Sequence, residues 1–165
     1  PSFFQEVDNA LAVYPDIPSH FLQLEVLESS VLDNLELIQS VLYDCRHKLG
    51  VSVALDDFGT GYSSLSHLRH LPANIIKIDQ SFVRDMLEDK NDYAIVEGVI
   101  ALSKAFKLKV IAEGVETEAH GVMLLELGCQ YAQGYGISRP MPAKDFPAWL
   151  ENFHAFPDWV NFDNS

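Results

Sequence analysis

The sequence predicts an α/β fold in which helices cover a parallel β-sheet. Short apolar runs alternate with longer amphipathic segments along the whole chain. This alternation is typical of parallel strands joined by helical crossovers. Glycines and prolines separate the segments. The 165 residues are 48% apolar, which is enough to form the core of one domain.

Six segments carry apolar residues at the 3.6-residue period of an amphipathic helix. Polar residues in the expected capping positions precede three of them, namely Asp33 or Asn34, Asp92, and Thr117. Gly50 and Gly128 are expected to end the second and fifth helices. The predicted helices span residues 3–13, 35–49, 65–71, 92–107, 118–127 and 143–150.

Five short apolar runs are predicted to be strands. The best defined one follows Gly50 and leads directly into two adjacent carboxylates, Asp56 and Asp57. Gly59 and Gly61 then permit backbone angles that other residues avoid, so a sharp loop is expected after this strand. The predicted strands span residues 21–26, 51–55, 75–78, 109–112 and 129–132.

Polar side chains lie in or just beyond every predicted strand. In a parallel sheet the carboxyl ends of the strands share one edge, where α/β enzymes place their active sites. Several carboxylates at such an edge suit Mg²⁺ or Mn²⁺, and a pair of these ions can activate a water for phosphoryl transfer. The polar residues are Glu25 with Glu28, Asp56 with Asp57, Lys77 with Asp79, Glu113 with Glu116, and Gln133.

A structural alternative is that these acids only cap the helices that follow the strands. It accounts well for Asp79 and for Glu116. It accounts poorly for Glu25 and Lys77, because both lie within predicted strands and not beyond their ends.

Composition limits the function further. The net charge of −13 argues against a protein that binds a DNA or RNA polymer electrostatically. Cys45 and Cys129 form no paired motif, and they are interpreted as reduced core residues in a reducing compartment. No apolar run approaches transmembrane length. The first residue is not methionine, so the chain is expected to begin inside a larger protein.

Five stretches resemble the motifs of the EAL-domain family of cyclic di-GMP phosphodiesterases, and their order and spacing agree over residues 21–150. The stretches are Leu-Glu-Val-Leu-Glu-Ser at 24–29, Ala-Leu-Asp-Asp-Phe-Gly-Thr-Gly-Tyr-Ser-Ser at 54–64, Lys-Ile-Asp-Gln-Ser-Phe at 77–82, Ala-Glu-Gly-Val-Glu-Thr at 112–117, and Gln-Gly-Tyr at 133–135 with Arg139-Pro140.

The resemblance implies a TIM-type (β/α) barrel that hydrolyses one phosphodiester bond of cyclic di-GMP and yields linear pGpG. It also implies two Mg²⁺ or Mn²⁺ ions as cofactors. By motif, Glu25, Asp56, Asp57 and Glu113 resemble the metal ligands. Glu113 resembles the catalytic carboxylate, as ligand or base. Lys77 resembles the lysine that orients the attacking water.

Four further residues resemble supporting groups of the family. Gln133 resembles a residue that supports the catalytic site. Glu28 resembles the acid that anchors the loop after Asp57, and the motion of that loop links the site to dimerisation. Asp79 and Glu116 resemble residues near the metal or the substrate.

The chain holds five of the eight strands of such a barrel. The family's Glu-Ala-Leu motif and the asparagine of its next strand do not occur at the expected place. Residues 1–152 are therefore expected to be the C-terminal part of the barrel, and residues 153–165 an acidic, aromatic tail that packs loosely. The isolated chain is expected to be inactive. The alternative function is a degenerate EAL domain that acts as a non-hydrolytic cyclic di-GMP receptor or as a protein-interaction module.

An incomplete barrel would expose the strands at 21–26 and 129–132 as sheet edges. It would also uncover the inner-face residues, expected to be Leu24, Val53, Ile76 and Ile111. A homodimer or higher assembly is therefore expected. Fusion upstream to the rest of the EAL domain and to GGDEF or sensor domains is expected as well. The location would be the cytoplasm, either free or as the cytoplasmic part of a membrane-anchored sensor.

Overall fold

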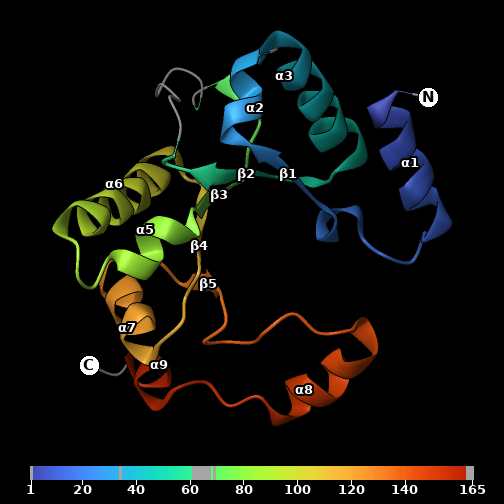
Figure 1. Ribbon diagram of the computed structural model, residues 1–165. Coiled ribbons are helices and arrows are strands. Elements are labelled where there is room, and N and C mark those ends of the chain that lie inside the picture. Colours follow the sequence, from blue (N-terminus) through green and yellow to red (C-terminus); the bar gives the residue numbers. More distant parts are fainter. Residues whose placement is uncertain (1, 34, 61–67, 69, 163–165) are drawn as a thin grey trace. The chain divides into compact units, whose positions relative to one another are not determined.

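The computed structural model describes residues 2–33, 35–60, 68 and 70–162 (Figure 1). The predicted helix at 65–71 falls largely outside these residues. The described strands are β1 (Gln23–Leu27), β2 (Ser52–Phe58), β3 (Ile75–Ile78), β4 (Lys109–Glu113) and β5 (Tyr131–Gln133). The described α-helices are α1 (Phe3–Val13), α2 (Glu28–Asp33), α3 (Leu35–Asp44), α5 (Gln80–Asp85), α6 (Lys90–Phe106), α7 (Glu118–Glu126), α8 (Phe146–Asn152) and α9 (Pro157–Val160).

The five strands form one sheet in the order β1-β2-β3-β4-β5. The pairings β1–β2 and β4–β5 are parallel, with Glu25 opposite Ala54 and Glu113 opposite Gln133. The predicted α/β class, the five strands and the two edge strands are thereby confirmed. Within the described residues β1 and β5 each have one neighbouring strand, so the sheet does not close into a barrel.

The chain divides into two compact units. Residues 1–77 with 102–109 form the first, and residues 78–101 with 110–165 form the second. In the first unit Val7 of α1 packs with Cys45 and Val51, and Leu24 of β1 packs against this cluster. The prediction that Leu24 faces the inside of a barrel is therefore wrong. Leu24 lies on the helix-covered face, and its neighbour Glu25 points to the other face because side chains alternate along a strand.

Two strands extend further than their apolar runs predict. Asp56 and Asp57 lie inside β2, and Glu113 is the last residue of β4. Polar residues at a strand end still take part in the ladder, although their composition suggests a loop. β5 starts two residues later than predicted, because the amide of Cys129 is bound to the carbonyl of Leu124 at the end of α7 (2.8 Å).

The helix ends agree with most of the predicted signals. α1 has the predicted bounds, and the Thr117 hydroxyl caps α7 by accepting a hydrogen bond from the amide of His120. Gly50 has the left-handed backbone (φ +79°) expected of a helix stop. Asp92 lies in the first turn of α6, which begins at Lys90, so it does not cap this helix. Asp33 ends α2 and does not begin the next helix, and Asn34 is outside the described residues.

Candidate active site

Lys77 is the most unusual residue of the sheet. All four residues of β3 are buried, and Lys77 is only 5% exposed. Its Nζ lies 3.0 Å from Glu25 Oε2 and 3.0 Å from Asp56 Oδ1. A buried ammonium is costly unless carboxylates surround it, so these contacts explain how the apolar strand accommodates a lysine. The three residues come from β1, β2 and β3, so neighbouring strands bring them together.

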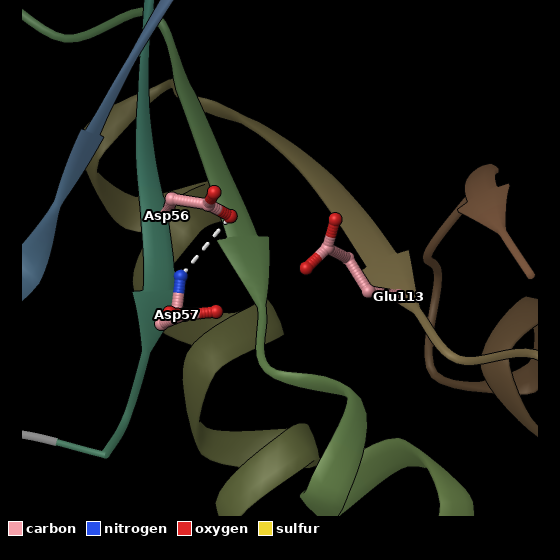
Figure 2. A group of neighbouring side chains, drawn as sticks. All are labelled: Asp56, Asp57 and Glu113. Atoms are coloured by element: carbon pink, nitrogen blue, oxygen red, sulfur yellow. Dashed lines mark hydrogen bonds between the residues drawn. The ribbon is translucent and has the colours of Figure 1, made fainter.

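Asp56 and Asp57 lie next to one another near the end of β2 and differ in conformation (Figure 2). Asp56 is partly buried, with 19% of its side chain exposed, and its Oδ1 accepts a hydrogen bond from the amide of Asp57 (3.1 Å). Asp57 has a left-handed backbone with φ of +54°, which is uncommon for any residue other than glycine. The hydroxyl of Thr60 donates to the Asp57 carbonyl (2.8 Å). The backbone therefore bends sharply at Asp57, one residue before β2 ends at Phe58.

Glu28 contacts Gly59, the first residue after β2. Glu28 is the first residue of α2 and is 3% exposed, and its Oε2 accepts a hydrogen bond from the amide of Gly59 (2.9 Å). The loop-anchoring role that the sequence resemblance implied for Glu28 stays a prediction. The link between this loop and dimerisation stays a prediction.

In the second unit, Glu113 is at the end of β4 (Figure 2), and Gln133 lies opposite it on β5. The loop after β5 lies against the loop after β4, because the Val115 amide donates to the Gln133 carbonyl (3.1 Å) and the Gly136 amide donates to the Val115 carbonyl (2.8 Å). A cavity of about 330 Å³ lies here, and the polar residues that line it are Gln80, Arg84, Glu113, Glu116, Gln133 and Tyr135.

Asp79 caps the helix that follows its strand, as the structural alternative predicts. Its carboxylate caps α5 by accepting hydrogen bonds from the amide of Ser81 (2.9 Å) and from the Ser81 hydroxyl. Its supporting role near the metal or substrate stays a prediction. Glu116 is exposed and lines the cavity beside Glu113.

Two features of this region were not expected from the sequence. Arg84 lines the cavity, and its carbonyl lies 3.0 Å from Nε2 of the buried His120, whose Nδ1 lies 2.8 Å from the Thr117 hydroxyl. The Arg139 guanidinium lies 4.4 Å from the centre of the Tyr135 ring. Neither Arg84 nor His120 stands in a periodic or charged pattern that would single it out.

The two cysteines are buried and form no disulfide. Burial, and next the nearby Asp44 carboxylate, raise the pKa of the Cys45 thiol. Burial also raises the pKa of the Cys129 thiol. Because the protonated form is then favoured at neutral pH, both cysteines fit the predicted role of core residues and neither fits that of a nucleophile.

The donor set at the strand ends suits a hard divalent cation. Glu25, Asp56, Asp57 and Glu113 offer carboxylate oxygens, the ligands that Mg²⁺ and Mn²⁺ prefer. Glu25 and Asp56 already converge on one positive charge, the ammonium of Lys77. The chain is thus a parallel β/α protein whose strand ends carry carboxylates and a lysine, an arrangement typical of metal-dependent hydrolases.

Comparison with known proteins identifies the family. The EAL domain model matches residues 1–140, so the chain belongs to the EAL-domain family. It is 44% identical over 142 residues to the bifunctional diguanylate cyclase/cyclic di-GMP phosphodiesterase MucR of Pseudomonas aeruginosa, covering 86% of this chain and 20% of that protein. It is 43% identical over 152 residues to the cyclic di-GMP phosphodiesterase NbdA of the same organism, covering 92% of this chain and 19% of that protein.

The fold matches as well. The solved PaMucR phosphodiesterase in complex with c-di-GMP has a TM-score of 0.81 and 42% sequence identity, over 86% of this chain and 57% of that structure. This chain spans about a fifth of the length of the curated relatives described above. No helix in the described ranges is long and apolar enough to cross a bilayer.

Proposed function

We propose that this chain is part of a cyclic di-GMP phosphodiesterase that hydrolyses one phosphodiester bond and yields linear pGpG. The observation that carries the proposal is the buried Lys77, with its Nζ 3.0 Å from carboxylates of both Glu25 and Asp56. An ammonium held between two acids at the carboxyl end of a parallel sheet is costly to maintain, and it suits a site that handles a phosphate. The family and the named phosphodiesterase relatives support the same reaction.

In this proposal Glu25, Asp56, Asp57 and Glu113 supply the oxygen ligands of two Mg²⁺ or Mn²⁺ ions. When bound, such ions acidify a water and neutralise the charge that develops on the phosphate. Lys77 orients this water by donating a hydrogen bond to its oxygen.

The water oxygen bonds to phosphorus and the bond from phosphorus to the 3′ oxygen breaks. The 3′ oxygen takes up a proton from solvent and leaves as a hydroxyl, because pGpG retains the phosphate at its 5′ end. The alternative role of Glu113 to that of a ligand is the base that takes a proton from the attacking water. Gln133, Glu116 and Asp79 support the site around it.

Substitution in a complete EAL domain that contains this chain tests these roles. Asp56→Asn and Glu113→Gln should each lower the rate of pGpG formation by at least about two orders of magnitude, as is typical when a base or an electrostatic group is removed. The exposed Glu97 of α6 provides the matched control, since Glu97→Gln makes the same chemical change away from the strand ends. Turnover close to that of the unsubstituted domain in both site variants would refute the assigned roles.

The ion requirement distinguishes hydrolysis from the alternative function of a receptor. We expect turnover with Mg²⁺ or Mn²⁺ and no tight Zn²⁺ binding at these carboxylates, because the proposed ligands are all oxygens. Calorimetry with cyclic di-GMP in metal-free buffer gives the comparison. Strong binding without a divalent ion, together with no linear product when Mg²⁺ is added, would support a receptor in place of an enzyme.

A further inference from the structure

A second cavity, of about 450 Å³, lies at the amino ends of β2, β3 and β4. Ser52, Asn74 and Lys109, which begin or directly precede these strands, line it. Because the strands are parallel, all of their amino ends lie together, at the opposite end of the strands from Asp56 and Lys77. The described residues that line this cavity belong to the first compact unit, as Asp56 and Lys77 also do. The cavity is separate from the candidate active site because it lies at the amino ends of the strands, whereas Asp56 and Lys77 lie toward their carboxyl ends.

The lining of this cavity is basic. It includes Arg46, Lys107 and Lys109, which are three of only 11 lysines and arginines in the chain. The described residues that line it include no aspartate or glutamate, although the chain has 24 of them. Because the chain has 24 aspartates and glutamates but 11 lysines and arginines, a set of residues drawn at random would contain more acids than bases. The cavity thus gathers positive charge in a protein of net charge −13.

Two polar side chains in the wall are held in place. Nη1 of the half-buried Arg46 donates a hydrogen bond to the Ala73 carbonyl (3.1 Å). Oδ1 of the half-buried Asn74 accepts one from the Val53 amide (3.0 Å). Since the Asn74 oxygen already accepts this hydrogen bond, the side-chain NH₂ group is the part of Asn74 that can donate to a ligand. A guanidinium and an amide NH₂ in fixed positions favour a ligand with several acceptor oxygens.

Lys107 occupies a position where the fold favours glycine. It has φ of +57° at the end of α6, where its amide bonds to the Lys104 carbonyl (3.2 Å) and the Leu108 amide bonds to the Ser103 carbonyl (2.9 Å). This is a Schellman motif, which usually has glycine at that position. The same motif ends α7 and has Gly128 there, with φ of +89°. The chain therefore keeps a lysine at 107 against a local conformational cost.

We propose that this cavity binds a small organic phosphate. Three cations suit a phosphate monoester, which carries close to two negative charges at neutral pH. Leu71, Phe106 and Leu108 supply an apolar part of the wall, which suits a ligand with an apolar or aromatic portion. The volume lies in the usual range for small-molecule sites. This proposal does not depend on the phosphodiesterase function.

Titration with phenyl phosphate tests the proposal, because this probe combines a phosphate monoester with one aromatic ring. Amide chemical shifts of the whole chain are followed in metal-free buffer, so that the acidic edge does not recruit the probe through an ion. We expect saturable shifts at residues 52, 74 and 107–109. Phenol, which lacks the phosphate, should produce none of them.

The variant Lys107→Gly removes the charge and relieves the backbone. It should weaken phenyl phosphate binding about tenfold, the usual effect of losing one charge-assisted hydrogen bond, while the melting temperature stays the same or rises. Lys104→Gln, in the last turn of the same helix but outside the cavity lining, is the matched charge control and should change the affinity less than about twofold. The proposal fails if phenyl phosphate does not saturate, or if Lys104→Gln weakens binding as much as Lys107→Gly.

Discussion

The backbone of Asp57 combines a candidate metal ligand with a conformation that L-residues disfavour. With φ of +54° it turns the chain out of β2, and Thr60 holds its carbonyl. Aspartate tolerates this region better than most residues do, because its short polar side chain bonds locally. Position 57 is therefore constrained twice, by the carboxylate that the proposed site needs and by the backbone angle that the loop needs.

A pair of substitutions separates these two constraints. Asp57→Ala and Asp57→Gly both remove the carboxylate, so both should abolish turnover in the complete domain. The glycine variant should be more stable to urea by about 1 kcal/mol, because it lacks the Cβ that makes positive φ unfavourable. In an ordinary strand alanine is the more stable of the two, so greater stability of Asp57→Ala would contradict the left-handed assignment.

The polar residues at the strand ends were predictable one by one, whereas their contacts were not. Lys77 interrupts an apolar run. This signal is visible in the sequence because burying a lysine is costly unless other groups compensate its charge. Its distances to Glu25 and Asp56 depend on the register of three strands, which no local pattern encodes. The predicted face of Leu24 was wrong for a related reason. In β1 the apolar Leu24 and Val26 alternate with the polar Gln23 and Glu25, but this alternation does not show which of the two faces meets the helices.

The contact between the loops that follow β4 and β5 depends on two glycines. A Cβ added to Gly134 would overlap the backbone of Val115, and one added to Gly136 would lie 2.7 Å from the Glu116 carbonyl. The loop after β5 can therefore approach the loop after β4 only without side chains at these positions. This approach sets the wall of the cavity that contains Glu113 and Gln133.

Gly134→Ala should lower the free energy of unfolding by about 1–3 kcal/mol, the usual cost of overpacking, and should also reduce turnover in the complete domain. Gly98→Ala is the matched control, because nothing lies within 4 Å of an added Cβ at this position in α6. It should raise the stability by about 0.5–1 kcal/mol, since alanine is favoured over glycine in a helix. Equal effects of the two substitutions in denaturant titrations would show that the loops do not need this close approach.

Helix and strand positions were largely predictable, and the differences have local causes. β3 and α1 have the predicted bounds, because α1 keeps a helical apolar period and β3 is apolar on both sides of Lys77. α2 was not expected, since its six residues begin with the glutamate that directly follows β1 and form too short a segment to show a period. The predicted helix at 35–49 is split, because its last five residues, Cys45–Leu49, have π-helical hydrogen bonding. Such bonding has no clear sequence signal.

The C-terminal segment packs more firmly than predicted. Trp159 of α9 is half-buried, and its Nε1 donates a hydrogen bond to the Glu118 carbonyl on α7 (2.8 Å). A Cβ on Gly121 would overlap the Trp159 ring, so the two helices meet closely at this glycine. The aromatic composition of the tail indicated hydrophobic surface but not the partner that covers it. The division of the chain at residue 152 stays a prediction.

The open sheet leads to an expectation for the purified 165-residue chain. An eight-stranded barrel surrounds its active site on all sides, whereas five strands leave both ends of the sheet without a partner strand. We therefore expect dimers or larger assemblies in light scattering and no pGpG from cyclic di-GMP in Mg²⁺. A monomer of intact mass that linearises cyclic di-GMP would show that these five strands alone suffice.

If the proposed function holds, the two edge strands of this sheet would let the chain serve as one half of a split enzyme. A separately expressed polypeptide carrying the first three strands of the family's barrel would find β1 on one side and β5 on the other as templates for docking. Fusing the two halves to a pair of interacting proteins would make phosphodiesterase activity depend on that interaction. In a bacterial cell the readout would be a fall in the concentration of cyclic di-GMP. The association of two proteins would then change the cellular processes that this second messenger controls.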